Sequence, residues 1–160
     1  MLFDLTVEEN LFLGKEIKKE FGICDRKAMR AKAEETLKRL GVSIPTDKVM
    51  SELSVGQQQM IEICKALMVD AKVIIMDEPT RGIDVGAKRE IHALLRQLAE
   101  SGVGVIVVSS ELPEVIGVSD RVAVMHEGCL AGFLEGEEVR EENIMKLASG
   151  EQLAEKELRQ

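Results

Sequence analysis

Two stretches of this 160-residue chain decide its expected fold: Leu53-Ser54-Val55-Gly56-Gln57 and Val73-Ile74-Ile75-Met76-Asp77-Glu78-Pro79-Thr80. The first places a serine, a favoured helix N-cap, before apolar residues that recur at helical spacing. The second is a continuous apolar run that ends in two adjacent acids, and such a run is typical of a strand buried on both faces. A helix followed by a buried strand predicts an α/β domain.

Further helices and strands are expected on both sides of these stretches. Asp25 can cap a helix that Gly41 ends, and Asp84 can cap another that Gly102 ends. A second apolar run, residues 103–108, predicts a buried strand, so the order strand, helix, strand implies two parallel neighbours. The expected inward-facing residues are Met29, Ala33, Leu37 and Leu40 in the first of these helices, Met60, Ile63, Cys64 and Leu67 in the helix after Ser54, and Ile91, Leu94, Leu95 and Leu98 in the third.

The end of the chain has a different pattern. Residues 121–125 and 129–133 flank His126-Glu127-Gly128 and predict a hairpin with glycine in the turn. A Glu-rich tail follows, with a short helix expected over residues 143–148 and frayed residues over the last ten. We predict three portions: a helical portion over 1–70, a catalytic core over 71–133 and an acidic tail over 134–160.

Composition narrows the class of protein. An apolar share of 45% and a charged share of 31% are typical of a soluble globular domain. A net charge of −8 with scattered Lys and Arg argues against nucleic acid as a partner. The longest apolar runs are far shorter than a membrane span, and the first residues do not resemble a secretory signal. Cys24, Cys64 and Cys129 are widely spaced, which predicts reduced, inert thiols that are buried or half-buried.

The two acids that end the first strand are the strongest candidates for chemistry. Open α/β sheets present ligand-binding groups at the carboxyl ends of their strands. Asp77 can hold Mg²⁺ through its water shell, and Glu78 can orient and deprotonate an attacking water. The alternative is a strand that ends in a solvated acidic turn. Motif matches are hypotheses until their structural context agrees.

Residues Ser54, Val55, Gly56 and Gln57 open a helix and are candidates for contact with a phosphate. The free N–H groups and positive dipole end of a helix attract anions, Gly56 permits close approach, and the Ser54 hydroxyl can donate. A simple serine N-cap explains the same residues equally well on their own. The Asp-Glu strand that follows favours the phosphate interpretation.

Ser109, Ser110 and Glu111 follow the second strand and are expected to face the same crevice as Asp77. Ser110 as a helix cap with Glu111 as a first-turn acid is an equally good interpretation. His92 is expected on the polar side of its helix and His126 in a turn, so neither predicts a catalyst.

Taken together, these residues resemble the ATP-binding subunit of bacterial carbohydrate ABC importers of the ribose/galactose type, over residues 5 to about 150. Subunits of that family contain two ABC ATPase halves in tandem. The resemblance implies part of an ABC-type P-loop NTPase domain, with a helical signature subdomain and a parallel-sheet core. It makes residues 53–57 the signature that closes on the partner site's γ-phosphate, Asp77 the Mg²⁺ carboxylate and Glu78 the general base.

The resemblance extends to two further loops. Gly82-Ile83-Asp84 would be the D-loop, which couples two sites across a dimer, and this places Asp84 among the nucleotide-contacting residues. Ser110 falls where many ABC ATPases have the switch histidine. Serine there is familiar in the second half of these importers, and it lowers the expected efficiency of hydrolysis.

The sequence also departs from the family pattern. It contains no Gly-rich loop ending in Lys-Ser or Lys-Thr, the Walker A segment. Residues 5–14 and 53–60 resemble the first ATPase half, whereas residues 81–88 and 109–115 resemble the second. We therefore hypothesise a fusion of the two halves by an in-frame deletion, joined near residues 77–80 and starting beyond the first P-loop. In the family a P-loop strand lies beside residues 103–108, so we expect an open edge there that promotes self-association.

Two functions follow from the resemblance and stay open at this point. In the first, the chain is an ATP-binding and ATP-hydrolysing component of a carbohydrate importer that needs a P-loop from elsewhere. In the second, it is a non-enzymatic remnant or regulatory fragment that only binds transporter subunits. The implied cofactors are ATP and Mg²⁺. The implied partners are a second ABC ATPase domain, transmembrane permease subunits and, indirectly, a sugar-binding protein, at the cytoplasmic face of the cell membrane.

Overall fold

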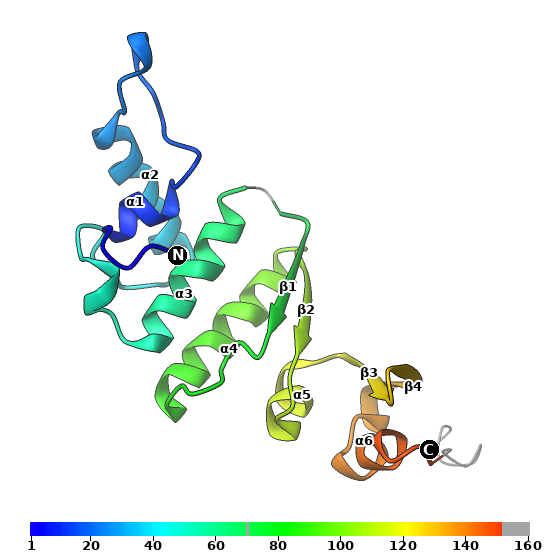
Figure 1. Cartoon of the computed structure of the whole chain (residues 1–160). Helices are drawn as coiled ribbons and strands as arrows, with labels where there is room; N and C mark the ends of the chain where they lie inside the picture. Colours follow the sequence, from blue (N-terminus) through cyan, green and yellow to red (C-terminus); the bar gives the residue numbers. More distant parts are fainter. Residues whose placement is uncertain (70, 152–160) are drawn as a thin grey trace. The chain divides into compact units, whose positions relative to one another are not determined.

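The structure, a computed structural model, describes residues 1–69 and 71–151 and separates them into two compact units (Figure 1). The first is Met1–Val108, and the second begins at Ser109. Most of the frayed end that the sequence predicts, residues 152–160, lies outside the described residues. The division into portions 1–70, 71–133 and 134–160 stays a prediction.

The first unit combines helices with one pair of strands. Its α-helices are α1 (Val7–Leu11), α2 (Arg26–Arg39), α3 (Val55–Leu67) and α4 (Val85–Glu100), its short 3-10 turns are η1 (Glu20–Gly22) and η2 (Met50–Glu52), and its strands are β1 (Val73–Asp77) and β2 (Gly104–Val108). The predicted N-caps are confirmed: the side chains of Asp25, Ser54 and Asp84 accept from the backbone N–H three residues later. The predicted inward-facing residues are buried except Leu67, which is half-buried.

Helix α1 was not predicted, although its signal is in the sequence. Thr6 and Glu9 form a reciprocal capping box at its start. The buried Asn10 amide then donates to the carbonyls of Leu2, Leu5 and Thr6, at 2.8, 3.3 and 3.1 Å. Because every polar atom of a buried amide needs a partner, Asn10 holds the first residues of the chain in one conformation.

The strands β1 and β2 are parallel neighbours, as predicted, with Val73 opposite Gly104 and Asp77 opposite Val108. The prediction that both faces are buried is wrong. Ile74 and Met76 pack on the helices, whereas Val73 and Ile75 on the other face are 55% and 70% exposed. On β2, Ile106, the partner of Ile75, and Val108, the partner of Asp77, are also exposed. The apolar pattern on both faces therefore indicates a second covering layer that the described residues leave unfilled.

The outer edge of β2 is open within residues 1–69 and 71–151, where β1 is its sole strand partner. This agrees with the predicted open edge. Self-association through that edge stays a prediction.

The second unit packs two helices with a hairpin. Its elements are α5 (Leu112–Val118), β3 (Arg121–His126), β4 (Cys129–Glu135), η3 (Gly136–Glu138) and α6 (Glu141–Ala148). The antiparallel pairing of β3 with β4 confirms the predicted hairpin, and α6 confirms the predicted short helix. Val122, Val124 and Leu134 form its small core with Ile144 and Leu147.

The prediction of buried or half-buried thiols holds for one cysteine and is wrong for two. Cys64 is buried, and burial raises the pKa of its thiol to about 12, which makes it inert. Cys24 and Cys129 are exposed rather than buried or half-buried, because Cys24 lies in a projecting loop and Cys129 at the hairpin turn. In the part of the chain that the structure describes, no helix has the length and apolar character needed to cross a membrane.

Candidate functional site

Helix α3 begins at a fully formed capping box. The Ser54 hydroxyl accepts from the Gln57 N–H at 3.3 Å, and the Gln57 side chain accepts from the Ser54 N–H at 3.1 Å. The cap interpretation of Ser54 is thus realised in the structure. Val55 and Gly56 lie in the first turn of α3, where the backbone N–H groups have no acceptor within the helix, and N–H groups of this kind can bind an anion.

Gln58 fixes the loop that leads into this helix. Its amide donates to the carbonyls of Met50 and Leu53, both at 3.1 Å. The same loop is paired with the start of the chain, since Met50 and Ser51 donate to the carbonyls of Leu5 and Phe3. The start of α3 is therefore held from two sides. Sequence reasoning missed Gln58, because one glutamine in a helix carries no signal of its own.

Gly56 has a packing role that the sequence did not reveal. A Cβ at this position would lie 2.6 Å from the Cβ of Ala87 and 3.3 Å from the Cγ2 of Ile83. Glycine is required here because α3 and the start of α4 approach more closely than any side chain permits. This contact brings the predicted signature, residues 53–57, against the loop and helix that follow Asp77 and Glu78.

Asp77 is the last residue of β1 and Glu78 is the first residue beyond it. The Glu78 N–H still donates to the Val108 carbonyl at 2.8 Å, which continues the strand pairing by one residue. Glu78 then turns sharply, with a φ of 48°. A left-handed conformation is costly for a residue with a side chain and recurs at functional sites. The strain supports a functional role for Glu78.

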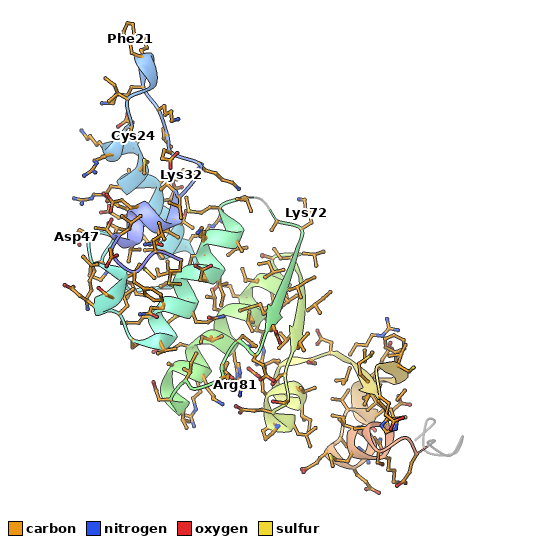
Figure 2. All side chains as sticks on the ribbon, in the orientation of Figure 1. Phe21, Cys24, Lys32, Asp47, Lys72 and Arg81 are labelled. Carbon is orange, nitrogen blue, oxygen red and sulfur yellow. The ribbon has the colours of Figure 1, made fainter. Side chains whose placement is uncertain are left out.

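The turn after Glu78 is held in place by two buried residues and a backbone hydrogen bond. Pro79 and Thr80 are fully buried, and Arg81 donates its N–H to the Glu78 carbonyl at 3.1 Å. Figure 2 labels Arg81 beyond this end of β1 and Lys72 at the opposite end. Buried residues on one side and a hydrogen-bonded turn on the other give the two carboxylates a fixed backbone.

Asp84 accepts from the Ala87 N–H at 3.0 Å and caps α4. Its predicted role in contact with a nucleotide stays a prediction, since the cap alone accounts for an acid here.

Ser109, Ser110 and Glu111 lie in the second unit. The interpretation of Ser110 as a helix cap is wrong: the N-cap of α5 is Glu111, without a side-chain cap bond, and its N–H donates to the Ser109 hydroxyl at 3.1 Å. The predicted nucleotide role of Ser110 stays a prediction. His126 contacts the Ala148 carbonyl through Nδ1 at 2.7 Å, which ties the hairpin to α6.

The donor set fits magnesium bound with a nucleotide. Within the described ranges, no three His, Cys, Asp or Glu side chains gather as a metal site. Mg²⁺ in nucleotide sites commonly keeps several waters and takes one or two carboxylates together with phosphate oxygens. Asp77, exposed at the end of a strand, would supply one such carboxylate.

Comparison with known proteins identifies the family. A family profile described as ABC transporter matches residues 2–81, half of the chain. The chain belongs to the ABC transporter family. The match includes both α3, with the predicted signature at its start, and the β1 strand with the two acids at its end. The chain is 51% identical over 152 residues to the ribose import ATP-binding protein RbsA 2 of Rhizobium meliloti, which covers 94% of this chain and 30% of the relative. It is 44% identical over 154 residues to RbsA of Lactococcus lactis, covering 94% of this chain and 31% of the relative.

Solved structures agree on the fold. An ATP-binding cassette of an ABC transporter in its ADP conformation is 30% identical, with a TM-score of 0.73, and the alignment covers 92% of this chain and 60% of that one. The cassette cbiO1 of Clostridium perfringens, part of an ABC transporter complex, is 28% identical, with a TM-score of 0.72, covering 91% of this chain and 57% of that one. The predicted α/β fold, a partial ABC cassette, is confirmed.

The chain spans about a third of the length of the curated relatives it matches. The hypothesis of a join between two halves stays a prediction, because homologous halves joined at equivalent positions keep the element order of a single cassette.

Proposed function

We propose that this chain supplies the signature helix, the Mg²⁺ carboxylate and the general base of an ATP-hydrolysing unit that drives carbohydrate import. Support comes first from similarity to ribose import ATP-binding proteins over nearly the whole chain. The observation that carries the proposal is the strained Glu78 at the end of a paired parallel strand, with Asp77 beside it.

The proposed chemistry divides between the two acids. Asp77 binds Mg²⁺, which neutralises charge on the transferred phosphate when nucleotide is present. Glu78 accepts a proton from the attacking water and orients it. The start of α3 offers its N–H groups and the Ser54 hydroxyl to a γ-phosphate held by a second ABC ATPase domain. Asp84 and Ser110 complete the proposed set of contacts.

Binding of ATP by this mechanism requires a P-loop from outside the 160 residues. Loss of one preorganised donor to developing charge costs about 10²–10³ in rate, and a P-loop supplies several such donors. We propose that permease subunits at the cytoplasmic face of the membrane are the partners, with a sugar-binding protein acting indirectly.

The test compares the chain alone with the chain fused to a family P-loop segment ahead of Leu2. We expect calorimetry to give no low-micromolar Mg-ATP binding for the chain alone and measurable binding for the fusion. In the fusion, Glu78→Gln should slow turnover by about 10²-fold or more while binding stays unchanged. The control is Glu90→Gln, an exposed acid on α4, which should alter neither. Unchanged turnover in Glu78→Gln would remove Glu78 as the base, whereas a fusion that binds Mg-ATP without any turnover would favour the alternative of a purely binding fragment.

A further inference from the structure

Residues 15–25, which lie between α1 and α2, form a projecting arm with an exposed phenylalanine at its tip. Phe21, at the tip that Figure 2 labels, is 98% exposed, and Ile23, two residues later, is 65% exposed. Exposed apolar side chains are common singly, but a phenylalanine with almost its whole surface in water at the end of a projecting loop is a candidate contact point.

The arm is held in a defined conformation. Lys19 and Ile23 are joined by a backbone hydrogen bond of 2.7 Å, and Asp25 donates to the Ile17 carbonyl at 2.7 Å. Lys18 and Cys24 form an isolated antiparallel bridge. Phe21 itself has a φ of 65°, in the left-handed region that disfavours an aromatic residue. The backbone therefore keeps the ring pointing outward at some cost in strain.

The arm and the first turns of α2 carry a positive charge that the rest of the chain does not share. Residues 15–32 contain seven Lys and Arg and three Asp and Glu, a net charge of +4 in a chain of net charge −8. Arg26 and Arg30 pair with Glu9 and Glu8 of α1. Lys15, Lys27 and Lys32 are exposed and form no ion pair within the described residues. The expectation that Lys and Arg are scattered along the chain is therefore wrong for residues 15–32.

We propose that this arm contacts the surface of an anionic phospholipid bilayer, with Phe21 and Ile23 entering the interfacial region and the surrounding lysines facing the headgroups. Apolar tips flanked by basic residues bind such surfaces through two additive effects. Burial of the ring removes apolar area from water, and each lysine near an anionic surface adds an attraction that salt weakens. A purely apolar protein pocket would not require the positive charge. The proposal is independent of the nucleotide chemistry, so the two can fail separately.

The chain contains no Trp and no Tyr, which permits a direct test. Phe21→Trp places the chain's one indole at the tip, and we expect its emission to shift to the blue when vesicles of phosphatidylcholine and phosphatidylglycerol (3:1) are added. Vesicles of phosphatidylcholine alone should give a much smaller shift. The control, Phe133→Trp at an exposed site on β4, should show none.

Binding strength gives the second measurement, by vesicle co-sedimentation of the full chain. Phe21→Asn should weaken binding about tenfold while the fold is kept, because Asn tolerates a left-handed φ. Lys15→Gln combined with Lys27→Gln should weaken binding by about tenfold or more at low salt. The matched control Met145→Gln removes an exposed apolar side chain on α6 and should change nothing.

An unshifted emission, or equal binding to both kinds of vesicle, would overturn the proposal. So would unchanged vesicle binding in Phe21→Asn combined with weaker capture of a co-expressed permease, a result that would assign the arm to a protein partner.

Discussion

The helical part of the first unit and its pair of strands differ in how completely they are packed. Ile61 of α3 is 1% exposed, whereas Ile75 of β1 is 70% exposed. Most apolar side chains of the helices α1 to α4 are buried, with Val55 and Val85 at the helix starts as exposed exceptions, while one face of β1 and β2 has no cover among the described residues. The helices that present the predicted signature thus have a well-packed core, and the strand that carries Asp77 and leads into Glu78 depends on a further layer.

Paired substitutions of the same residue type test this difference most strongly. Ile61→Ala removes a fully buried side chain and should lower the free energy of unfolding by about 2–5 kcal/mol. Ile75→Ala, on the open face, should change it by no more than about 0.5 kcal/mol. Chemical denaturation of both variants beside the parent chain measures the two values. Comparable losses would mean that something covers the outer face of β1.

A smaller effect is expected where the helical part meets the loop that follows the two acids. Gly56→Ala forces a methyl group to within 2.6 Å of the Ala87 Cβ. Overpacking costs about 1–3 kcal/mol, and the better helix propensity of Ala returns about 1 kcal/mol, so a net loss of up to about 2 kcal/mol is expected. Gly117→Ala in α5, where an added Cβ meets no atom within 4 Å, is the control and should be neutral or stabilising. A Gly56→Ala variant that is stabilised as much as Gly117→Ala would contradict the close approach of α3 and α4.

The smallest expected effect on stability is a pH dependence that arises from Glu9 at the start of α1. The backbone N–H of Thr6 lowers the pKa of Glu9, with further help from the Thr6 hydroxyl and Arg26. A lowered folded-state pKa means that the stabilisation is present above the unfolded value of about 4.5 and is lost as pH falls through the folded value. Glu9→Gln should therefore be less stable than the parent at pH 6, and the difference should shrink as the pH falls below 4.5. If the free energies of unfolding of the two proteins differ by the same amount at every pH in this range, the Glu9 carboxylate does not stabilise α1.

Much of the fold was predictable because its signals are local. Asp25, Ser54 and Asp84 each precede a helical apolar pattern, and the structure uses all three as caps. The order strand, helix, strand along the chain predicted that the two apolar runs pair in parallel.

The remaining features depend on contacts that no short stretch of sequence encodes. The sequence predicts that Gly56 lets the backbone approach a phosphate, and only the structure shows that Gly56 packs against Ala87. No sequence feature around Glu78 indicates that its backbone is left-handed. The run Val73-Ile74-Ile75-Met76 is apolar on both faces, as in a strand covered by two layers. Among the described residues, only the face with Ile74 and Met76 is covered.

Amide hydrogen exchange across α3 and β2, measured on the full chain at low concentration, tests the central claim directly. That claim is that the signature part is complete and the strand pair incomplete. We predict strong protection of α3 from Met60 to Cys64 and much faster exchange over β2, whose outer edge is open. Protection of β2 equal to that of α3 in a chain that sediments as a monomer would contradict the claim, since the strand pair would then be as complete as the helices.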